Sequence, residues 1–359
     1  MAKKLAFDKV LFTIVILLIS FGLVMVYSAS SALAPEHALH RFLIKQAVAA
    51  GLGLVLMAWL MHVDYRRLRA PATVYTLLGV ALALLIGVLF SPPLNATRRW
   101  FFVAGVSIQP SELAKLALIP FLAYQIDKKE ERVDELSFLL PAGFFTALLA
   151  ALILLEPDMG TAVLLGATFF LMLFLAGLSW RYILAGLAVV PPLLGLLVMM
   201  EPYRRQRLFA FLDPERDPLG TGFQALQSLI AVGSGGIFGL GPGKSMQKLF
   251  FLPHPESDFI FSIVAEELGM IGALAVVAAF CVLAWRGLRA GAKAPDRFGR
   301  HLGWGLTGVL VMQALINLSV TLALLPTKGI PLPFISYGGS SLVGTLCICG
   351  VLLNISQHA

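Results

Sequence analysis

Long apolar runs, separated by shorter polar segments, recur along almost the whole chain. A helix needs about 20 apolar residues to cross the hydrocarbon core of a membrane. Ten runs come close to that length: residues 10–28, 44–62, 72–90, 111–127, 138–155, 160–177, 181–200, 259–285, 302–324 and 339–355. The pattern predicts an all-α integral membrane protein with ten transmembrane helices, folded as a single domain over residues 1–359.

One long polar segment, residues 201–258, interrupts this pattern between the seventh and eighth runs. Within it Phe223, Leu226, Leu229 and Ile230 recur at helical spacing, but the stretch is too short and too polar to span a membrane. We expect a short helix there that lies at the membrane interface or re-enters the bundle. The segment ends with Asp258, directly before the eighth run.

Basic residues predict the orientation, because cytoplasmic loops carry an excess of Lys and Arg. With the N-terminus inside, only Arg41, Lys45, Arg98, Arg99 and Lys328 fall in short external loops. Three times as many fall in cytoplasmic segments: Lys3, Lys4, Lys9, Arg66, Arg67, Arg69, Lys128, Lys129, Arg132, Arg181, Arg286, Arg289, Lys293, Arg297 and Arg300. Both termini are then cytoplasmic, and the segment 201–258 forms an extracytoplasmic loop.

The first run, residues 10–28, has an alternative interpretation as a signal peptide, since small residues follow it. It is longer than the 7–15 apolar residues typical of a signal peptide. This length favours an uncleaved first helix.

Composition agrees with a membrane protein and argues against a soluble domain or a nucleic-acid-binding protein. Hydrophobic residues make up 58% of the chain and charged residues 13%, whereas soluble domains carry about 25% charged residues. Basic residues outnumber acidic ones, 27 to 20, but a nucleic-acid surface needs a water-facing basic patch that this chain largely lacks. The three cysteines lie in apolar runs without a second ligand at metal-binding spacing, so we expect packing residues, no disulfide framework and no metal site.

Ionisable residues at the outer ends of the predicted helices are candidates for function, because charge inside a membrane is costly. Glu112 and Lys115 lie three residues apart on one helix and can pair. The pair either neutralises itself so that the helix inserts, or belongs to a site. Arg98 and Arg99 precede a tryptophan, where they either anchor the chain at the membrane interface or contact a ligand.

Two acids occupy a tight outward turn between the fifth and sixth predicted helices. Asp158 is expected to cap the helix that follows it. Glu156 has no such simple structural explanation.

Asp258 has two interpretations. Ser257 or Asp258 is a natural N-cap for the eighth helix, where the helix dipole favours a carboxylate. Ser262, Glu266 and Gly269 follow at helical spacing, however, so that a polar stripe would run below Asp258 along one helix face. Such a stripe predicts a polar cavity that opens outward, with Asp258 at its mouth.

A second outward segment, residues 326–341, ends in glycines and serines that open the last helix, among them Ser340. Free backbone N–H groups there favour an anion, although close packing of small residues explains the same pattern. Carboxylates, basic side chains and a helix N-terminus together suit a lipid-linked diphosphate. Cations stabilise the diphosphate as a leaving group, and one carboxylate accepts a proton from an attacking hydroxyl.

Four segments resemble the SEDS family (shape, elongation, division and sporulation), and the resemblance covers essentially the whole chain. They are Arg98, Arg99 and Trp100 with the run 109–115 (Gln-Pro-Ser-Glu-Leu-Ala-Lys), residues 156–162 (Glu-Pro-Asp-Met-Gly-Thr-Ala), residues 220–267 and residues 326–341. Glu156 and the runs 245–248 and 326–329 resemble the division and sporulation members more than the elongation members. His254, Ser257 and Ala323 depart from the residues usual in the family.

The resemblance implies a ten-span protein of the bacterial inner membrane that polymerises lipid II into glycan strands. A class B penicillin-binding protein is the expected partner and supplies the transpeptidase. At the matching positions, Asp258 resembles the essential acid of the family's external loop, and Glu112 and Lys115 resemble its buried ion pair. Its basic motifs fall on Arg98, Arg99, Lys244 and Lys248.

We therefore expect Asp258 to take the proton of the attacking sugar hydroxyl. Arg204, Arg205 and Arg207, with Lys244 and Lys248, are expected to bind the diphosphates of lipid II and of the departing undecaprenyl diphosphate. The sequence requires no cofactor. It does not decide whether a Mg²⁺ or Mn²⁺ ion binds at the diphosphate.

Two alternative functions remain at this point. A lipid II flippase performs no chemistry, and a polar groove through a helical bundle suits it equally. A scaffold would only recruit the transpeptidase. Polar residues cluster in the outer half of the predicted bundle, which favours chemistry on the external face over transport.

Overall fold

The computed structural model describes residues 7–31, 36–93, 97–103, 106–129, 133–214, 222–249, 251–253, 255–327 and 329–359. Five residues used above lie outside this part of the chain: Lys3, Lys4, Arg132, His254 and Lys328.

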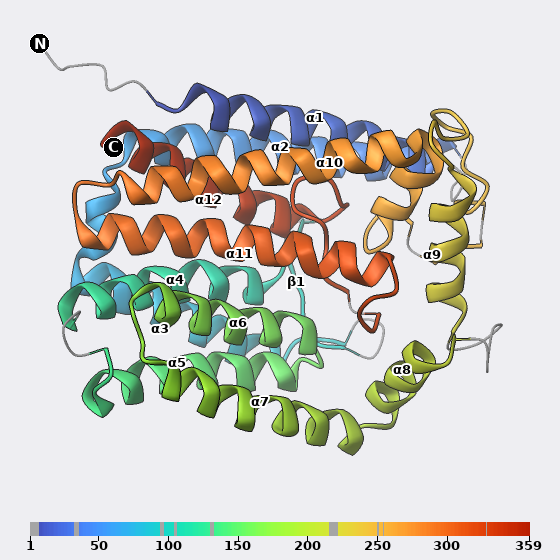
Figure 1. The fold of residues 1–359 in the computed structure, drawn as a ribbon. Coiled ribbons are helices and arrows are strands. Elements are labelled where there is room, and N and C mark those ends of the chain that lie inside the picture. Colours follow the sequence, from blue (N-terminus) through green and yellow to red (C-terminus); the bar gives the residue numbers. More distant parts are fainter. Residues whose placement is uncertain are drawn as a thin grey trace, which may run out of the picture.

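Each of the ten apolar runs coincides with a helix (Figure 1). These helices are α1 Lys9–Ser30, α2 Glu36–His62, α3 Pro71–Val88, α4 Pro110–Lys129, α5 Leu136–Leu155, α6 Met159–Leu175, α7 Trp180–Met200, α10 Ile260–Ala292, α11 Arg297–Thr321 and α12 Gly339–Gln357. Within the described residues, eight are long and apolar enough to cross a membrane. Helix α6 is shorter, with 17 residues, and α4 carries Glu112, Lys115 and Asp127. The multi-pass helical architecture is confirmed, and the count of ten spans stays a prediction.

The segment 201–258 contains two further helices, α8 Pro202–Leu212 and α9 Phe223–Ser234. Helix α9 lies across one end of the bundle (Figure 1), against α10 and α11. Its buried residues are the small ones, Ala225, Ser228 and Ala231, whereas Leu229 and Ile230 of the expected apolar face are exposed. Small side chains let two helices approach closely, which explains why α9 packs on this face.

Two short elements had no signal in the apolar pattern. Strands β1 Phe101–Val103 and β2 Val106–Ile108 form an antiparallel hairpin between α3 and α4, in which Phe101 pairs with Ile108. A 3₁₀ helix, η1 Tyr65–Arg69, joins α2 to α3. The all-α class is confirmed, and the hairpin is an addition that was not predicted, because three-residue strands are too short to produce a recognisable alternation.

The long helices lie roughly side by side, with α8 and α9 at one end and the start of α1 and the end of α12 at the other (Figure 1). The backbone N–H of Asp8 donates to Ser356 Oγ at 3.1 Å, which joins the start of α1 to the end of α12. Helix α12 packs along α2, and α11 contacts α4, α6 and α10. Helix α7 lies at the edge, and none of its 21 residues is buried.

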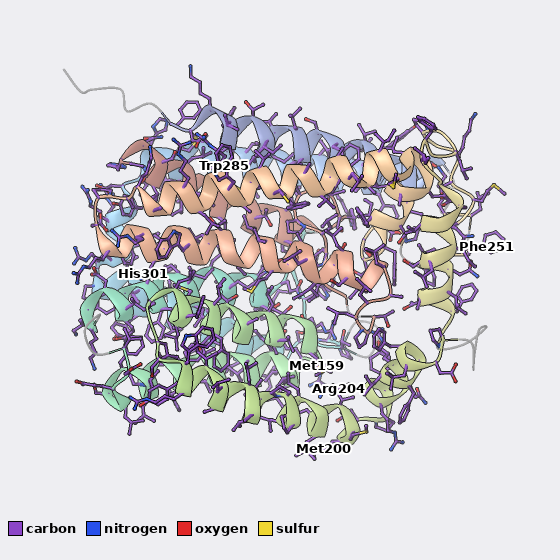
Figure 2. All side chains as sticks on the ribbon, in the orientation of Figure 1. Met159, Met200, Arg204, Phe251, Trp285 and His301 are labelled. Atoms are coloured by element: carbon purple, nitrogen blue, oxygen red, sulfur yellow. The ribbon has the colours of Figure 1, made fainter. Side chains whose placement is uncertain are left out.

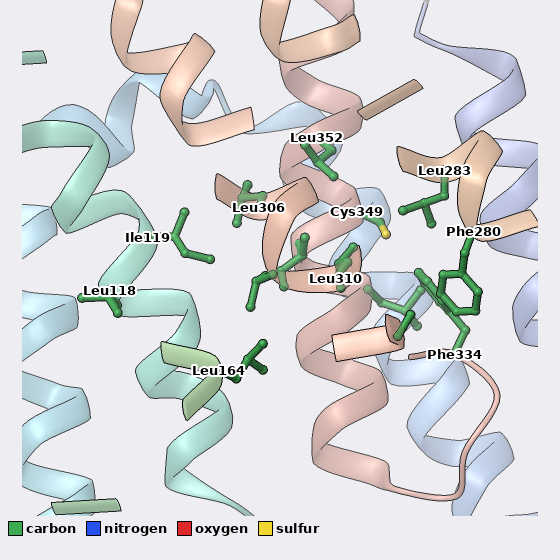
Figure 3. Close-up of a cluster of buried hydrophobic side chains, with 14 of the residues drawn as sticks. Leu118, Ile119, Leu164, Phe280, Leu283, Leu306, Leu310, Phe334, Cys349 and Leu352 are labelled. Atoms are coloured by element: carbon green, nitrogen blue, oxygen red, sulfur yellow. The ribbon is translucent and has the colours of Figure 1, made fainter. Parts of the chain in front are cut away.

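Hydrophobic side chains from several helices, and Phe334 from the segment that precedes α12, fill the centre of the bundle (Figure 3). Leu118 of α4, Leu164 of α6 and Leu310 of α11 are among them, together with Cys349 of α12. Cys349 is buried, as expected of a packing residue, although Cys281 is exposed on α10, and all three cysteines are free.

Helix α10 is broken at Gly269, whose φ of 67° lies in the left-handed region. The glycine-rich stretch 235–241 fills the break. The N–H of Leu240 donates to Glu266 O at 3.0 Å, and the N–H of Met270 donates to Gly236 O at 2.9 Å. Backbone groups at a helix break must find new partners, and this stretch supplies them. A Cβ on Gly239 would lie 2.2 Å from Glu267 O, so the two backbones are in direct contact.

We expect Gly239→Ala to lower the free energy of unfolding by about 2 kcal/mol or more. The residue has a φ of 79°, which costs a non-glycine residue about 1–3 kcal/mol, and the new Cβ would collide with Glu267 O. The fall in the midpoint of thermal unfolding of the detergent-solubilised protein measures the effect. Gly233→Ala is the control, because a Cβ there meets nothing within 4 Å. Equal melting of the two variants would contradict the proposed backbone contact.

Candidate active site

A cavity of about 250 Å³ opens at the end of the bundle that carries α8. Residues from five separate segments line it: Arg99, Pro157, Asp158, Met159, Gly160, Val198, Tyr203, Arg204, Arg207, Leu208, Asp258, Pro326, Thr327 and Gly329. Figure 2 shows Met159 at the start of α6 and Arg204 on α8 facing the same region. Five of the side chains predicted from the sequence, Arg99, Asp158, Arg204, Arg207 and Asp258, therefore meet in one cavity.

Asp258 is held in place through its backbone. Asn317 of α11 donates from Nδ2 to Asp258 O at 2.9 Å and to Ile330 O at 2.8 Å. Ser336 Oγ donates to Ser257 O at 2.6 Å. A Cβ on Gly329 would lie 3.2 Å from Asp258 Oδ2, so the carboxyl group lies against the segment 326–337.

The interpretation of Asp258 or Ser257 as a helix cap was wrong. The N-cap of α10 is Phe259, and no side chain caps this helix. Asp258 lies one residue earlier, in the turn, and its side chain faces the cavity. Capping therefore does not explain the presence of this acid.

Three guanidinium groups face the cavity from two different elements. Arg204 and Arg207 lie three residues apart on α8 and so share a face, whereas Arg205 is exposed and does not line the cavity. Arg207 Nη1 donates to Thr327 O at 3.1 Å, and its guanidinium stacks on the Tyr203 ring. Arg99 Nε donates to Glu156 O at 2.8 Å. A guanidinium has five N–H donors, so each group keeps donors for an anionic ligand.

Asp158 caps α6, as expected. Its carboxylate accepts from the backbone N–H of Thr161 at 3.0 Å and from Thr161 Oγ1 at 2.8 Å. The start of α6 therefore opens onto the cavity with an acid at its edge. Among the described residues, no three His, Cys, Asp or Glu side chains gather as a set of metal ligands.

Glu156 lies beside the cavity wall but is fully buried, and neither carboxyl oxygen has a hydrogen-bond partner among the residues that the structure describes. Burial, followed by the negative charge of Asp158, raises its pKa from 4.5 to about 8, against the lowering effect of Arg99. Glu156 is consequently a neutral acid at pH 7.

The side chains expected to form a polar stripe below Asp258 do not line the cavity that holds Asp258. Ser262 Oγ hydrogen-bonds to Ser228 Oγ of α9 at 2.6 Å. Glu266 accepts from Ser245 Oγ and from the N–H of Met246, the latter at 2.9 Å. Both side chains are buried, because the first part of α10 is covered by α9 and by the stretch 243–249.

Lys248 is also buried, and its donors are used inside the protein. Its Nζ lies 2.9 Å from Glu267 Oε1 and 2.7 Å from Gly243 O. Lys244, four residues earlier, is exposed. Neither lysine lines the cavity that holds Asp258.

Glu112 and Lys115 form the predicted ion pair, with Nζ and Oε2 2.8 Å apart, and both are buried. Lys115 Nζ also donates to Gln313 Oε1 at 2.8 Å, and Gln313 Nε2 donates to Pro331 O at 2.9 Å. The pair thus connects α4 through α11 to the segment that carries Gly329.

The two remaining predicted residues make contacts outside the cavity. Arg98 Nη1 donates to Leu89 O at 2.8 Å at the end of α3. Ser340 Oγ donates to Ser107 O at 2.6 Å and fastens the β1–β2 hairpin to the start of α12.

Sequence reasoning missed Asn317, Gln313 and Tyr203. Asn317 and Gln313 are amides within an apolar run, and a polar residue at such a position is a signal for a functional or structural contact. Tyr203 follows a proline in a polar stretch and carried no signal of its own.

This arrangement defines a multi-pass membrane protein with a cationic, acid-bearing cavity at one end of its helical bundle. The chain belongs to the FtsW/RodA/SpoVE family of cell cycle proteins, whose family model matches residues 8–359. The resemblance noted in the sequence is thereby confirmed.

Relatives are similar over nearly their full length. A probable peptidoglycan glycosyltransferase FtsW of Geobacter metallireducens is 46% identical, over 98% of this chain and 95% of the relative. Stage V sporulation protein E of Bacillus subtilis is 41% identical, over 99% of each chain. These names confirm the closer resemblance to division and sporulation members.

Solved structures share the fold. A chain of a peptidoglycan synthase complex, in which polymerization and crosslinking are coordinated, is 34% identical and superposes with a TM-score of 0.82 over 98% of both chains. The rod shape determining protein RodA of Thermus thermophilus is 31% identical, with a TM-score of 0.73 over 98% of this chain and 97% of that one.

We expect Lys248→Met to destabilise the protein by about 3–5 kcal/mol, because it leaves Glu267 charged, buried and unpaired. The double variant Lys248→Met/Glu267→Gln should recover most of this loss, since it removes both charges. Thermal unfolding of the three proteins in one detergent measures the effect. A single variant as stable as the wild type would show that the ion pair does not hold the stretch 243–249.

The raised pKa of Glu156 predicts a pH dependence of stability. The folded protein keeps this proton up to about pH 8, whereas the unfolded chain releases it near pH 4.5. Its stabilising contribution is therefore complete below pH 4.5 and is lost between pH 4.5 and 8, at up to about 1.4 kcal/mol per pH unit. Glu156→Gln stays neutral throughout.

The melting midpoint of Glu156→Gln, relative to the wild type, should therefore rise from pH 5 to 8 and level off above. Glu201→Gln, at an exposed carboxyl group, is the matched control and should follow the wild type. A difference between Glu156→Gln and the wild type that stays constant with pH would contradict the prediction.

Proposed function

We infer that this protein is a peptidoglycan glycosyltransferase, the activity carried in the names of its FtsW relatives. It polymerises lipid II into glycan strands, as its similarity to a chain of a peptidoglycan synthase complex also supports. The observation that carries this function on the structure is the meeting of Asp258 with Arg99, Arg204 and Arg207 in one cavity.

The proposed reaction needs one base and a site for a diphosphate. Asp258 accepts the proton of the 4-hydroxyl of the N-acetylglucosamine unit of one lipid-linked substrate. The resulting oxygen attacks the anomeric carbon of the other substrate from the face opposite the diphosphate. The new C–O bond forms as the bond to the diphosphate breaks, so the configuration inverts, and undecaprenyl diphosphate leaves.

The three arginines supply the electrostatic part of this mechanism. Arg99, Arg204 and Arg207 keep N–H donors for the phosphate oxygens, and a guanidinium binds phosphate in a bidentate manner. Negative charge grows on the diphosphate as the bond breaks, so these contacts strengthen towards the transition state. A cavity of about 250 Å³ is too small for two lipid-linked disaccharides, which therefore extend outside it.

A divalent cation fits this proposal as an addition to the arginines. Asp158 offers one carboxylate at the cavity edge, and phosphate oxygens and water would complete six oxygen ligands around Mg²⁺ or Mn²⁺. Bound there, the ion would neutralise part of the diphosphate charge.

The proposed orientation places the end with α8 and α9 outside the bacterial inner membrane and both termini in the cytoplasm. The excess of Lys and Arg near the opposite ends of the helices supports it. We further propose that a class B penicillin-binding protein supplies the crosslinking activity beside this chain, because crosslinking accompanies polymerization in the similar complex.

Asp258→Asn should lower the rate of lipid II polymerisation at least about 100-fold, since a general base contributes about 10²–10⁴-fold, with little change in melting temperature. Purified protein with its penicillin-binding partner and lipid II gives the measurement, as polymer on a gel. Asp213→Asn, an exposed acid at the end of α8, is the control and should keep full activity.

Undiminished polymer from Asp258→Asn would refute the assigned base. Movement of the lipid II headgroup across liposomes without any polymer from the wild type would favour a flippase instead. Polymerisation with and without added chelator measures the contribution of a divalent cation.

A further inference from the structure

A second cavity, of about 330 Å³, lies at the end of the bundle opposite Asp258. It forms where the first turn of α1 meets the last turns of α10 and α12 (Figure 1). In the proposed orientation this end faces the cytoplasm. The proposed polymerisation uses none of its residues.

Four basic side chains line this cavity, Lys9, Arg286, Arg289 and Lys293, together with one carboxylate, Asp8. Asp8 Oδ1 accepts from the N–H of Val10 and of Leu11, both at 3.0 Å, and so caps α1. Its Oδ2 accepts from Arg286 Nε at 2.7 Å. Among the described lining residues, Asp8 is the one acidic side chain; both of its oxygens are engaged, and Arg286 is the cation that it neutralises.

The positive charges of the other three basic side chains are not balanced by an ion pair within the described residues. Within the described residues, Lys9, Arg289 and Lys293 make no ion pair, and all three are exposed. Like charges gathered at one cavity repel one another, so an anion that enters it relieves this repulsion and finds donors already in place.

Val10 lines this cavity, and two further apolar side chains, Trp285 and Leu288, are exposed on the same part of α10 as its basic residues. Trp285 is 58% exposed, and the guanidinium groups of Arg286 and Arg289 lie 5.4 and 5.9 Å from its ring centre. Figure 2 shows Trp285 at this end of the bundle. Tryptophan beside basic residues is typical of the boundary between membrane and water. Val10 and Leu288 are exposed next to the basic groups as well.

We propose that this cavity binds the headgroup of an anionic phospholipid, with the phosphate at Arg289, Lys293 and Lys9. The exposed apolar side chains then contact the acyl chains. A free phosphate ion would gain nothing from Val10, Trp285 and Leu288, whereas a lipid uses both the charge and the apolar border. The bound lipid bridges α1 and α10, which pack against each other along the bundle.

Thermal unfolding and native mass spectrometry of the full-length protein in neutral detergent test the proposal. The probes are phosphatidylglycerol, phosphatidylcholine and inorganic phosphate. Phosphatidylglycerol should raise the melting temperature and stay bound, since a ligand of the folded state stabilises it, whereas the other two should not. Arg289→Ala/Lys293→Ala should weaken phosphatidylglycerol binding about 25-fold, at about fivefold for each basic residue.

Arg67→Ala/Arg181→Ala is the matched control, because it removes the same charge from exposed positions elsewhere, and it should bind like the wild type. Arg289→Lys/Lys293→Arg keeps the charge and should retain binding even where the alanine variant unfolds. Equal binding of phosphatidylcholine, an equal shift with inorganic phosphate, or undiminished binding by a folded alanine variant would each overturn the proposal. Since the readout is binding, these outcomes are independent of polymerisation.

Discussion

The backbone contact between the stretch 235–241 and the break in α10 is the constraint on which the site depends. A helix cannot be interrupted within a membrane protein unless its freed N–H and C=O groups are bonded elsewhere. Residues of the glycine-rich stretch provide those bonds at Glu266, Glu267 and Met270. The break turns residues 260–268 into a short buried helix of their own, and Asp258 stands directly before it. The position of the proposed base thus depends on this backbone contact together with the hydrogen bonds from Asn317 and Ser336.

Charged residues divide into two groups with different tasks. Lys248 with Glu267, and Glu112 with Lys115, are buried and paired, and they join distant segments of the bundle. Within the described residues, Arg99, Arg204 and Arg207 donate to backbone carbonyls, and Arg207 also stacks on Tyr203, so that all three remain at the cavity. A buried charge needs a partner of opposite sign. A cavity that receives an anion instead needs cations that are not already paired with an acidic side chain.

The sequence predicted the helices well because hydropathy is what a membrane selects for, and each apolar run lies on a helix. The β1–β2 hairpin and the break at Gly269 were not predicted, since both depend on contacts with residues far away in the chain. Ser262 and Glu266 do share a face of α10 ahead of the break, but α9 and the stretch 243–249 cover that face, so it does not line the cavity of Asp258. Of the predicted site, Asp258 and three arginines do share a cavity. Lys248 has the same charge as the arginines and lies near Asp258 in the sequence. Only the fold shows that Lys248 lies outside the cavity and the arginines lie within it.

The wall that carries Asp258 and the wall that carries Arg204 and Arg207 are fixed in place by different contacts. Asp258 is fastened to α11 and to the segment 326–337 by hydrogen bonds inside the protein. Arg204 and Arg207 lie on α8, which continues from α7, a helix without a single buried residue. Arg204 and Arg207 nevertheless tie α8 to the bundle, through hydrogen bonds to Leu154 O and Thr327 O. On the side of α8, the spacing between the proposed base and the cations therefore rests on these hydrogen bonds to backbone carbonyls rather than on a buried helix face.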